Sequence, residues 1–196
     1  MNAILDEALF CHVGFSVRGQ PFVLPMVHAR IAEQLYIHGS IASRLLKRVK
    51  SRVNVCVTAT LLDGLVLARS AFHHSMNYRS VVILGKAHEL TDEAEKRLAL
   101  TALVEHVLAG RSEVVRGPSK KELRATSVLR LPITEASAKI RGGPPLDDEA
   151  DYALSCWAGV LPLHLRAAAP VPDPQLPATT ALPPTLAAWS RGRASP

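Results

Sequence analysis

The sequence has few cysteines and no long apolar run. Its 196 residues include three cysteines, Cys11, Cys56 and Cys156, which lie far apart and form no CxxC pair. This spacing disfavours a disulfide framework or a cysteine zinc site and fits a reducing compartment. No segment is long and apolar enough to span a membrane. Because Asp6 and Glu7 stand where a signal peptide needs basic residues and a long apolar run, we expect a soluble cytoplasmic protein.

The common catalytic and nucleotide-binding motifs are also absent. The patterns GxGxxG, GxxxxGK, GxSxG and HExxH do not occur, which argues against a Rossmann, P-loop, α/β-hydrolase or zinc-protease site. The net charge of +6 fits an anionic ligand but is too diffuse to indicate nucleic acid. A nucleic-acid surface would lack the interleaved aromatic residues that stack on bases. Its basic residues would be Arg44, Lys47, Arg48, Lys50 and Arg52.

The composition changes near Leu165. Residues 167–196 hold 7 of the 14 prolines of the chain. Proline removes backbone donors and breaks helices. The sequence therefore predicts one folded domain over residues 1–165 and an extended, largely disordered tail over residues 166–196.

Alternating apolar and polar residues predict that strands dominate the domain. In VNVCVTA, the alternation predicts that Val53, Val55 and Val57 face the core. RGQP offers a turn, and Asp63-Gly64 between two apolar runs predicts a hairpin. The predicted strands are residues 10–17, 22–31, 34–38, 53–59, 79–90 and 127–136.

Two helices are expected among these strands. One would begin with Ser40 as N-cap and cover residues 40–50. The other would have Thr91 as N-cap, cover residues 92–109 and end before Gly110. Many short strands with few helices favour a mainly β fold, either a closed antiparallel barrel or a sandwich.

The stretch YIHGSIASRLLK joins a predicted strand to a predicted helix. The strand would end at His38, and Gly39 would permit a tight turn before Ser40. Amides at a helix N-terminus bind anions, most commonly phosphate. Ser43 and Arg44 lie in the first turn, where Arg44 can bind a phosphate with two hydrogen bonds. The alternative is an ordinary surface helix with a solvated basic face.

A group of polar side chains precedes the apolar run VVILG. These side chains can supply donors for a phosphate and a polar ring edge, or can form a polar loop between strands. The adjacent His73 and His74 would point to opposite faces of a strand, so they are poorly placed to share a metal ion. Haem needs only one histidine and remains open. The polar group is Ser75, Asn77, Tyr78, Arg79 and Ser80.

The stretch CWAGVLPL contains a tryptophan, Trp157, followed by Ala-Gly. This pattern is consistent with an aromatic ring packed close to a backbone or to a flat ligand. A core or dimer-interface tryptophan is the alternative.

Four stretches, taken in order, resemble the flavin-binding split-barrel family related to pyridoxamine 5′-phosphate oxidase, in the branch that includes nitroimidazole reductases. The resemblance covers most of residues 4–165. It implies a six-stranded antiparallel split β-barrel with flanking helices, in a homodimer with FMN at the subunit interface. FAD is the alternative flavin, and haem is an alternative cofactor. The stretches are ILDEA with HVGFSVRGQPFVLPMVHAR, LYIHGSIASRLLK, HHSMNYRSVVILGKAHEL and CWAGVLPL.

The resemblance also implies which residues would bind the flavin. The isoalloxazine would be lined by Met26, Val27 and His28. The phosphate segment would comprise His38, Gly39, Ser40, Ser43 and Arg44. Further contacts would come from Ser75, Asn77, Tyr78, Arg79, Ser80 and Trp157.

The expected function is that of an FMN-dependent oxidoreductase acting on a small molecule, with no nucleic acid or membrane as partner. In such a site the flavin supplies the redox chemistry, and the protein supplies binding, orientation and water exclusion. The arginine and lysine pattern of true pyridoxamine phosphate oxidases is not evident, which argues against pyridoxal phosphate synthesis. The alternative is a flavin- or haem-binding split-barrel protein without turnover.

Overall fold

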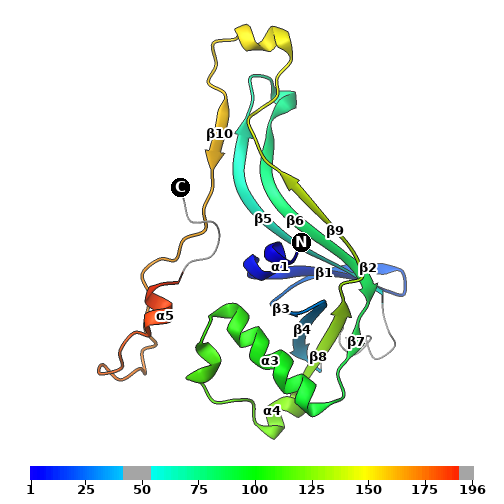
Figure 1. The fold of residues 1–196 in the computed structure, drawn as a ribbon, viewed down its shortest axis with the longest axis vertical. Helices are drawn as coiled ribbons and strands as arrows, with labels where there is room; N and C mark the ends of the chain where they lie inside the picture. The colour runs from blue at the N-terminus through cyan, green and yellow to red at the C-terminus, as the bar shows by residue number, and fades with distance from the viewer. Residues whose placement is uncertain (42–53, 190–196) are drawn as a thin grey trace.

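The computed structural model describes residues 1–41 and 54–189, which form a mainly antiparallel β structure with few helices (Figure 1). The expected fold class is therefore confirmed. The strands are β1 (Cys11–Val17), β2 (Gln20–Met26), β3 (His28–Ile31), β4 (Gln34–Ser40), β5 (Asn54–Leu67), β6 (Ser75–Lys86), β7 (His88–Glu89), β8 (Thr126–Pro132), β9 (Glu135–Arg141) and β10 (Gly159–Pro162). The helices are α1 (Asn2–Glu7), α3 (Glu93–Val107), α4 (Lys120–Ala125) and α5 (Pro184–Ala187), with 3-10 helices at Ala71–His73, Arg111–Glu113 and Glu149–Ala153.

The described strands form two sheets, which gives the split of a split barrel. One sheet has six strands in the order β2-β1-β5-β6-β9, with β10 paired to β5. The other has four strands in the order β3-β4-β8-β7. The chain passes between the sheets after β2, after β4, after β6 and after β8. The expected barrel is therefore split. Its two sheets share one core but do not close into one continuous sheet.

The main core lies between the two sheets and includes residues of α1. The alternation of β5 buries Val55 and Val57 in this core and leaves Cys56 exposed, as the sequence predicts. Ile37 of β4 enters the same core from the other sheet. Tyr36, its neighbour, packs in a second cluster with residues of α3. The outer face of the four-stranded sheet is thus covered by α3. Val53 and residues 42–50 of the expected first helix lie outside the described residues.

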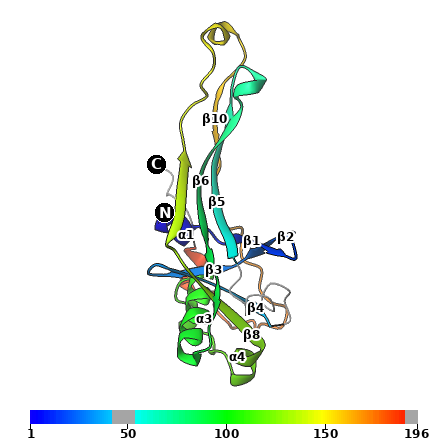
Figure 2. The same ribbon diagram turned by 90° about the vertical axis from the view of Figure 1, so that its right-hand side faces the viewer.

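A long arm, defined as residues 60–80 and 138–162, projects beyond the core (Figures 1 and 2). The prediction of a hairpin at Asp63-Gly64 is wrong, because β5 continues through these residues and pairs with β6 on both sides of them. The register with β6 shifts between Leu62 and Gly64. A β-bulge inserts one extra residue and bends a strand without reversing it. The Asp-Gly pair therefore marks a bulge at the base of the arm.

Two local predictions are confirmed with small changes. The turn between β1 and β2 has positive φ angles at Arg18 (51°) and Gly19 (82°), as the favoured two-residue hairpin turn requires. The second expected helix is α3, but its N-cap is Asp92 and not Thr91. The Asp92 carboxylate accepts a hydrogen bond from the Glu95 amide (2.7 Å).

Two of the strand boundaries that differ from the sequence prediction bear on the predicted site residues. β4 does not end at His38, because Gly39 and Ser40 continue its pairing with β8. The strand expected over residues 22–31 is interrupted at Val27, where the chain leaves one sheet and enters the other. In both cases the partner strand sets the boundary.

Beyond β10, residues 163–189 are largely exposed and have little regular structure. They run from the arm back toward α3, and α5 lies near the end of that helix (Figure 1). There a Cβ on Gly110 would be 3.7 Å from Thr185 Cγ2. The domain boundary at residue 165 stays a prediction. In the part of the chain that the structure describes, every helix is too short or too polar to cross a membrane.

Candidate functional site

One cavity, which we call the α3 cavity, lies between α3, the segment leading to α4 and the ends of the four-stranded sheet. Its volume is about 630 Å³, within the range of about 300–1,000 Å³ that is common for ligand sites. Its walls are mainly apolar. The lining residues that matter here are Val27, His38, Leu100, Leu103, Val104 and Val107.

His38 brings an unpaired polar atom to the α3 cavity. Its Nδ1 is buried and has no hydrogen-bond partner among residues 1–41 and 54–189. Burial lowers the pKa of the imidazole, because desolvation disfavours the charged form. A buried nitrogen without a partner costs stability unless water or a ligand bonds to it. His38 is therefore suited to bind a polar group of a ligand as a neutral imidazole.

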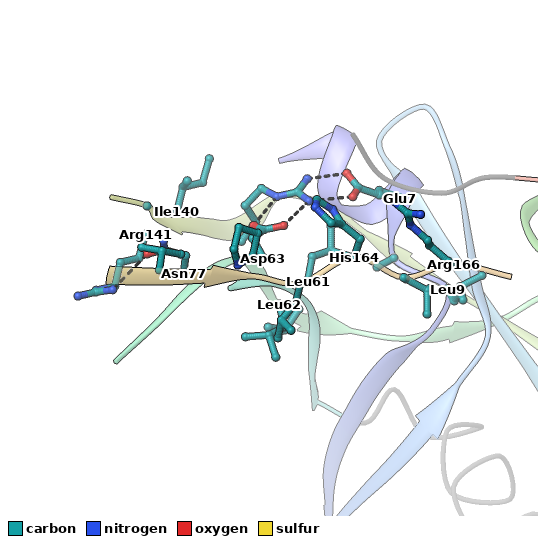
Figure 3. A pocket seen from close by; sticks show the side chains of 18 of the residues that line it. Glu7, Leu9, Leu61, Leu62, Asp63, Asn77, Ile140, Arg141, His164 and Arg166 are labelled. Atoms are coloured by element: carbon teal, nitrogen blue, oxygen red, sulfur yellow. Dashed lines mark hydrogen bonds and ion pairs between the residues drawn. The ribbon is translucent and has the colours of Figure 1, made fainter. Parts of the chain in front are cut away.

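A second cavity, which we call the arm cavity, lies at the base of the arm and has a volume of about 910 Å³ (Figure 3). It is lined by the end of α1, the bulged part of β5, β6, the end of β9, and the segment around β10. Polar and charged side chains are prominent in it. They are Glu7, Asp63, Asn77, Arg79, Arg141, His164 and Arg166.

The Arg79 guanidinium is held by two carboxylates in the arm cavity. It donates to Glu7 from Nη1 (2.5 Å) and Nη2 (2.8 Å). It also donates to Asp63 from Nε (2.8 Å) and Nη2 (2.7 Å). The hydrogen bonds to Asp63 and Glu7 raise the pKa of Arg79 above its usual value. Arg79 thus ties α1 to the bulge of β5, and within this chain its charge is offset by its neighbours.

Asn77 and Arg141 form a second polar contact farther along the arm. The Asn77 side-chain amide donates to the Gly143 carbonyl (3.1 Å). Arg141 Nη1 donates to Asn77 Oδ1 (3.2 Å) and to the Met76 carbonyl (3.1 Å). In Figure 3, Arg141 and Arg166 lie toward opposite ends of the arm cavity, with His164 between them.

Two residues expected at the isoalloxazine, His28 and Met26, contact other parts of this chain. His28 is fully buried, and its Nε2 donates to the Leu5 carbonyl (2.8 Å). Its ring also packs against His106, with ring centroids 4.7 Å apart. Met26 packs against the main core. Neither residue lines the α3 cavity or the arm cavity.

The polar group around Asn77 is part of a strand and not of a loop between strands. Ser75, Tyr78 and Ser80 all belong to β6, and a lysine, Lys139, lies over the Tyr78 ring at 5.9 Å. The preceding His73 is the last residue of a 3-10 helix. Because side chains alternate along a strand, the group cannot converge on one ligand from within this chain.

Trp157 lies on the arm with 68% of its surface exposed. A Cβ on Gly159 would come within 3.0 Å of two atoms of its ring. The ring therefore packs close to the backbone, as the Trp-Ala-Gly pattern indicates. Ser43 and Arg44 lie outside the described residues, and Ser40 is exposed at the end of β4.

The structure thus divides the predicted site residues between two cavities. Val27 and His38 line the α3 cavity, whereas Asn77 and Arg79 line the arm cavity. Sequence analysis missed the carboxylates that hold Arg79, because Glu7 is 72 positions away from it. The Asp-Gly pair inside an otherwise continuous apolar run was the available signal for the bulge.

Comparisons with known proteins agree with the fold. Residues 1–140 match the family model described as pyridoxamine 5′-phosphate oxidase. None of the curated proteins compared with the chain matches it.

Two solved structures are similar to nearly the whole chain. The flavocytochrome Anf3 from Azotobacter vinelandii is 43% identical, with a TM-score of 0.90, over 97% of this chain and 89% of that protein. The FAD and haem binding protein from Mycobacterium smegmatis is 35% identical, with a TM-score of 0.92, over 97% of this chain and 93% of that protein.

A third similar structure is a protein assigned to 5-nitroimidazole antibiotic resistance in Bacteroides thetaiotaomicron. It is 26% identical, with a TM-score of 0.58, over 70% of this chain and 80% of that protein. Since the family model spans residues 1–140 and the sheets form a split barrel, the chain belongs to the pyridoxamine 5′-phosphate oxidase family.

Proposed function

We propose that the protein binds a flavin, FMN or FAD, at the α3 cavity and acts as a flavin-dependent oxidoreductase on a small molecule. The observation that carries this proposal is the buried, unpaired Nδ1 of His38 in a mainly apolar cavity. An isoalloxazine offers both an apolar ring and polar edge atoms. The names of two structures that match 97% of this chain, a flavocytochrome and an FAD and haem binding protein, support a flavin.

The chain's own residues would bind and orient the flavin. Val27 and the leucines of α3 would pack against the ring and exclude water, and His38 would hydrogen-bond a polar atom. Arg111 lines the same cavity and forms no side-chain hydrogen bond or ion pair within the described ranges. We assign the phosphate to Gly39, Ser40, Ser43 and Arg44, in keeping with the family resemblance. The flavin would supply the redox chemistry.

We further propose a homodimer in which the arm of one copy completes the flavin site of the other. Exposed apolar side chains are frequent on the arm, including Phe72 (90%), Ile140 (70%) and Trp157 (68%). A monomer leaves such an apolar surface in water, whereas an interface removes it. The partner's arm would then bring Tyr78, Ser80 and Trp157 to the cofactor. We place the protein in the cytoplasm, since its three free thiols fit a reducing compartment.

The purified protein tests the flavin directly. We expect flavin absorbance near 450 nm, release of the cofactor by heat, and identification of FMN or FAD by its mass. A dimeric mass in light scattering is expected for the loaded protein. Protein purified without flavin that also fails to bind added FMN and FAD would refute the proposal.

Two pairs of variants test the binding residues. Arg44→Ala should weaken flavin binding by about 1.5–3 kcal/mol, because a phosphate needs fixed positive donors. Lys50→Ala, in the same basic segment, is the control and should change little. His38→Ala should weaken binding through loss of its hydrogen bond, and exposed His12→Ala is the matched histidine control. Equal losses in Arg44→Ala and Lys50→Ala would indicate diffuse electrostatics.

A flavin- and haem-binding protein without turnover is the second candidate. The names of the structures that are 43% and 35% identical favour it, because both imply haem as well as flavin. A Soret band in the purified protein, without consumption of a reductant and a small-molecule acceptor, would support this function over the first.

A further inference from the structure

Residues 163–189, which we call the strap because they cross the base of the arm after β10, make few contacts with the rest of their own chain (Figure 1). The Leu163 amide donates to the Asp63 carbonyl (3.0 Å), which ties the start of the strap to the bulge of β5. Beyond this point, residues 164–182 are all exposed. Within the described ranges, the other hydrogen bonds of the strap join its own residues to each other.

The strap nevertheless follows one path in similar proteins. Two solved structures match 97% of this chain with TM-scores of 0.90 and 0.92. The strap is 27 of the 196 residues, and a different path for so large a share would hold the TM-score below these values. Keeping an extended segment on one path costs conformational entropy, which contacts must offset. Because its own chain supplies few contacts, we expect another molecule to supply them.

The composition of the strap is that of an interface. Only two of its residues, Arg166 and Asp173, are aspartate, glutamate, lysine or arginine. Segments that stay disordered in water are rich in charge, whereas the centre of an interface is depleted of it. The strap includes Pro-Val-Pro-Asp-Pro, residues 170–174, which we call the proline segment. Proline-rich segments are extended and apolar, and aromatic-lined surfaces bind them.

The far end of the arm exposes aromatic side chains. Phe72 is 90% exposed, Trp157 68% and Tyr152 53%. Arg69 joins the two sides of this end, because its Nη1 donates to Asp147 (3.1 Å) and its guanidinium carbon lies 5.0 Å from the centre of the Tyr152 ring. The aromatic surface is therefore held in place by the chain itself. We call it the arm tip, residues 69–73 and 147–157 (Figure 1).

The proline segment and the arm tip each lack a cover. Val171 (92%) and Phe72 (90%) are the two most exposed large apolar side chains of the described residues. The strap leads away from its own arm tip toward α3, so the two surfaces do not meet within one chain (Figure 1). In a two-fold dimer, the strap of each copy can meet the arm tip of the other. One kind of contact then covers both surfaces.

We propose that the proline segment of one copy packs on the arm tip of a second copy, in a reciprocal contact. This inference rests on the homodimer of the proposed function and names a surface that holds it together. The strap ends beside α3, where a Cβ on Gly110 would lie 3.7 Å from Thr185 Cγ2. The next residue, Arg111, lines the α3 cavity. An arm that packs on the partner's strap therefore lies at the rim of the partner's flavin site.

Trypsin cleavage tests the contact on the full-length protein. Arg166 is the only lysine or arginine of the strap, so peptides that begin at Ala167 report cleavage there. Mass photometry of the same dilution series gives the monomer–dimer equilibrium. We expect cleavage after Arg166 to be about tenfold or more faster in the monomer than in the dimer, because the partner's arm restricts the opening of the strap.

Phe72→Asp on the arm tip and Val171→Asp on the proline segment are the test variants. Each places a charge in the contact and should raise the Kd of the dimer about tenfold or more. Phe72→Asp should also speed cleavage after Arg166, although it changes no residue of the strap. The control is Leu98→Asp, because Leu98 is 57% exposed on α3 and lines neither cavity. It should change the Kd less than about twofold.

A double variant tests whether the two side chains belong to one contact. Phe72→Asp with Val171→Asp should raise the Kd by less than the product of the two single increases, since the second charge enters a contact that is already broken. Thermal melts check that each variant is folded.

The proposal is overturned if the test variants dimerise as Leu98→Asp does, if trypsin cuts monomer and dimer equally fast after Arg166, or if the two increases in Kd multiply. A chain that stays monomeric at every concentration would refute both this contact and the proposed homodimer, whereas a dimer with an unprotected strap would refute the contact alone. Flavin content at 450 nm is measured in the same samples. A protected strap in a protein that binds no flavin would refute the flavin function alone.

Discussion

Replacing Arg79 by methionine should destabilise the protein by about 3 kcal/mol. Methionine keeps most of the stem of the side chain but removes the cation between Glu7 and Asp63. The side chains of Arg79, Glu7 and Asp63 are 13%, 20% and 36% exposed. Removing one partner of a buried ion pair costs about 3–5 kcal/mol, because a buried charge is left without compensation. The partial exposure of Asp63 places this case at the lower end of that range.

Urea unfolding followed by circular dichroism measures the effect. With a slope of about 2 kcal/mol per M, a loss of about 3 kcal/mol lowers the midpoint by about 1.5 M. A double-mutant cycle with Glu7→Gln isolates the contact between α1 and β6. We expect a coupling energy of about 1.5 kcal/mol or more, since two charge-assisted hydrogen bonds join this pair.

The matched control is Arg97→Met. Arg97 pairs with Glu93 (2.8 Å) on the surface of α3, and the two side chains are 39% and 63% exposed. An exposed pair at this spacing contributes about 0.3–0.5 kcal/mol. If Arg79→Met costs no more than Arg97→Met, or if the cycle with Glu7→Gln gives less than about 0.5 kcal/mol, the ion pairs do not anchor α1 as the geometry implies.

Three further predictions concern thiols, acid stability and the strap. Burial raises the pKa of the Cys11 thiol to about 12, so native protein at pH 8 should expose only Cys56 and Cys156 to a thiol reagent. Immediate reaction of all three thiols would contradict this. Hydrogen bonds from the side chain and backbone of Ser112 and from the Gly110 amide lower the pKa of Glu105. The stability that the ionised Glu105 contributes is therefore present above the usual carboxyl pKa and is lost as the pH falls through the lowered pKa. Glu105→Ala should cost stability at pH 7 in urea unfolding, and its difference from wild type should shrink toward pH 3; a constant difference would refute this. A Cβ on Gly64 would lie 3.0 Å from a backbone oxygen of β10, so Gly64→Val should loosen β10 and the strap. We expect Gly64→Val to be cleaved faster by a protease after β10. The control Cys56→Val, on the exposed face of β5, should keep the wild-type cleavage pattern.

Some features of this protein follow from the sequence alone, because they depend on neighbouring residues. The alternation of Val55 and Val57 with polar positions sets which face of β5 is buried, whatever the partner strand. Arg18-Gly19 has the residues that a two-residue turn needs, and the acids at the start of α3 mark its first turn. The mainly β class and the family resemblance rest on such local patterns.

Other features required the tertiary structure. Asp63-Gly64 has the local pattern of a hairpin, yet pairing with β6 on one side and β10 on the other carries β5 through a bulge without reversing it. Arg79 has the residue type of a phosphate ligand, yet the fold brings Glu7 of α1 to it. His28 and His38 look alike in sequence, but one bonds to a carbonyl in the core and the other lines a cavity. Periodicity fixes which face of a strand is buried, whereas long-range register and packing decide which charges and cavities meet there.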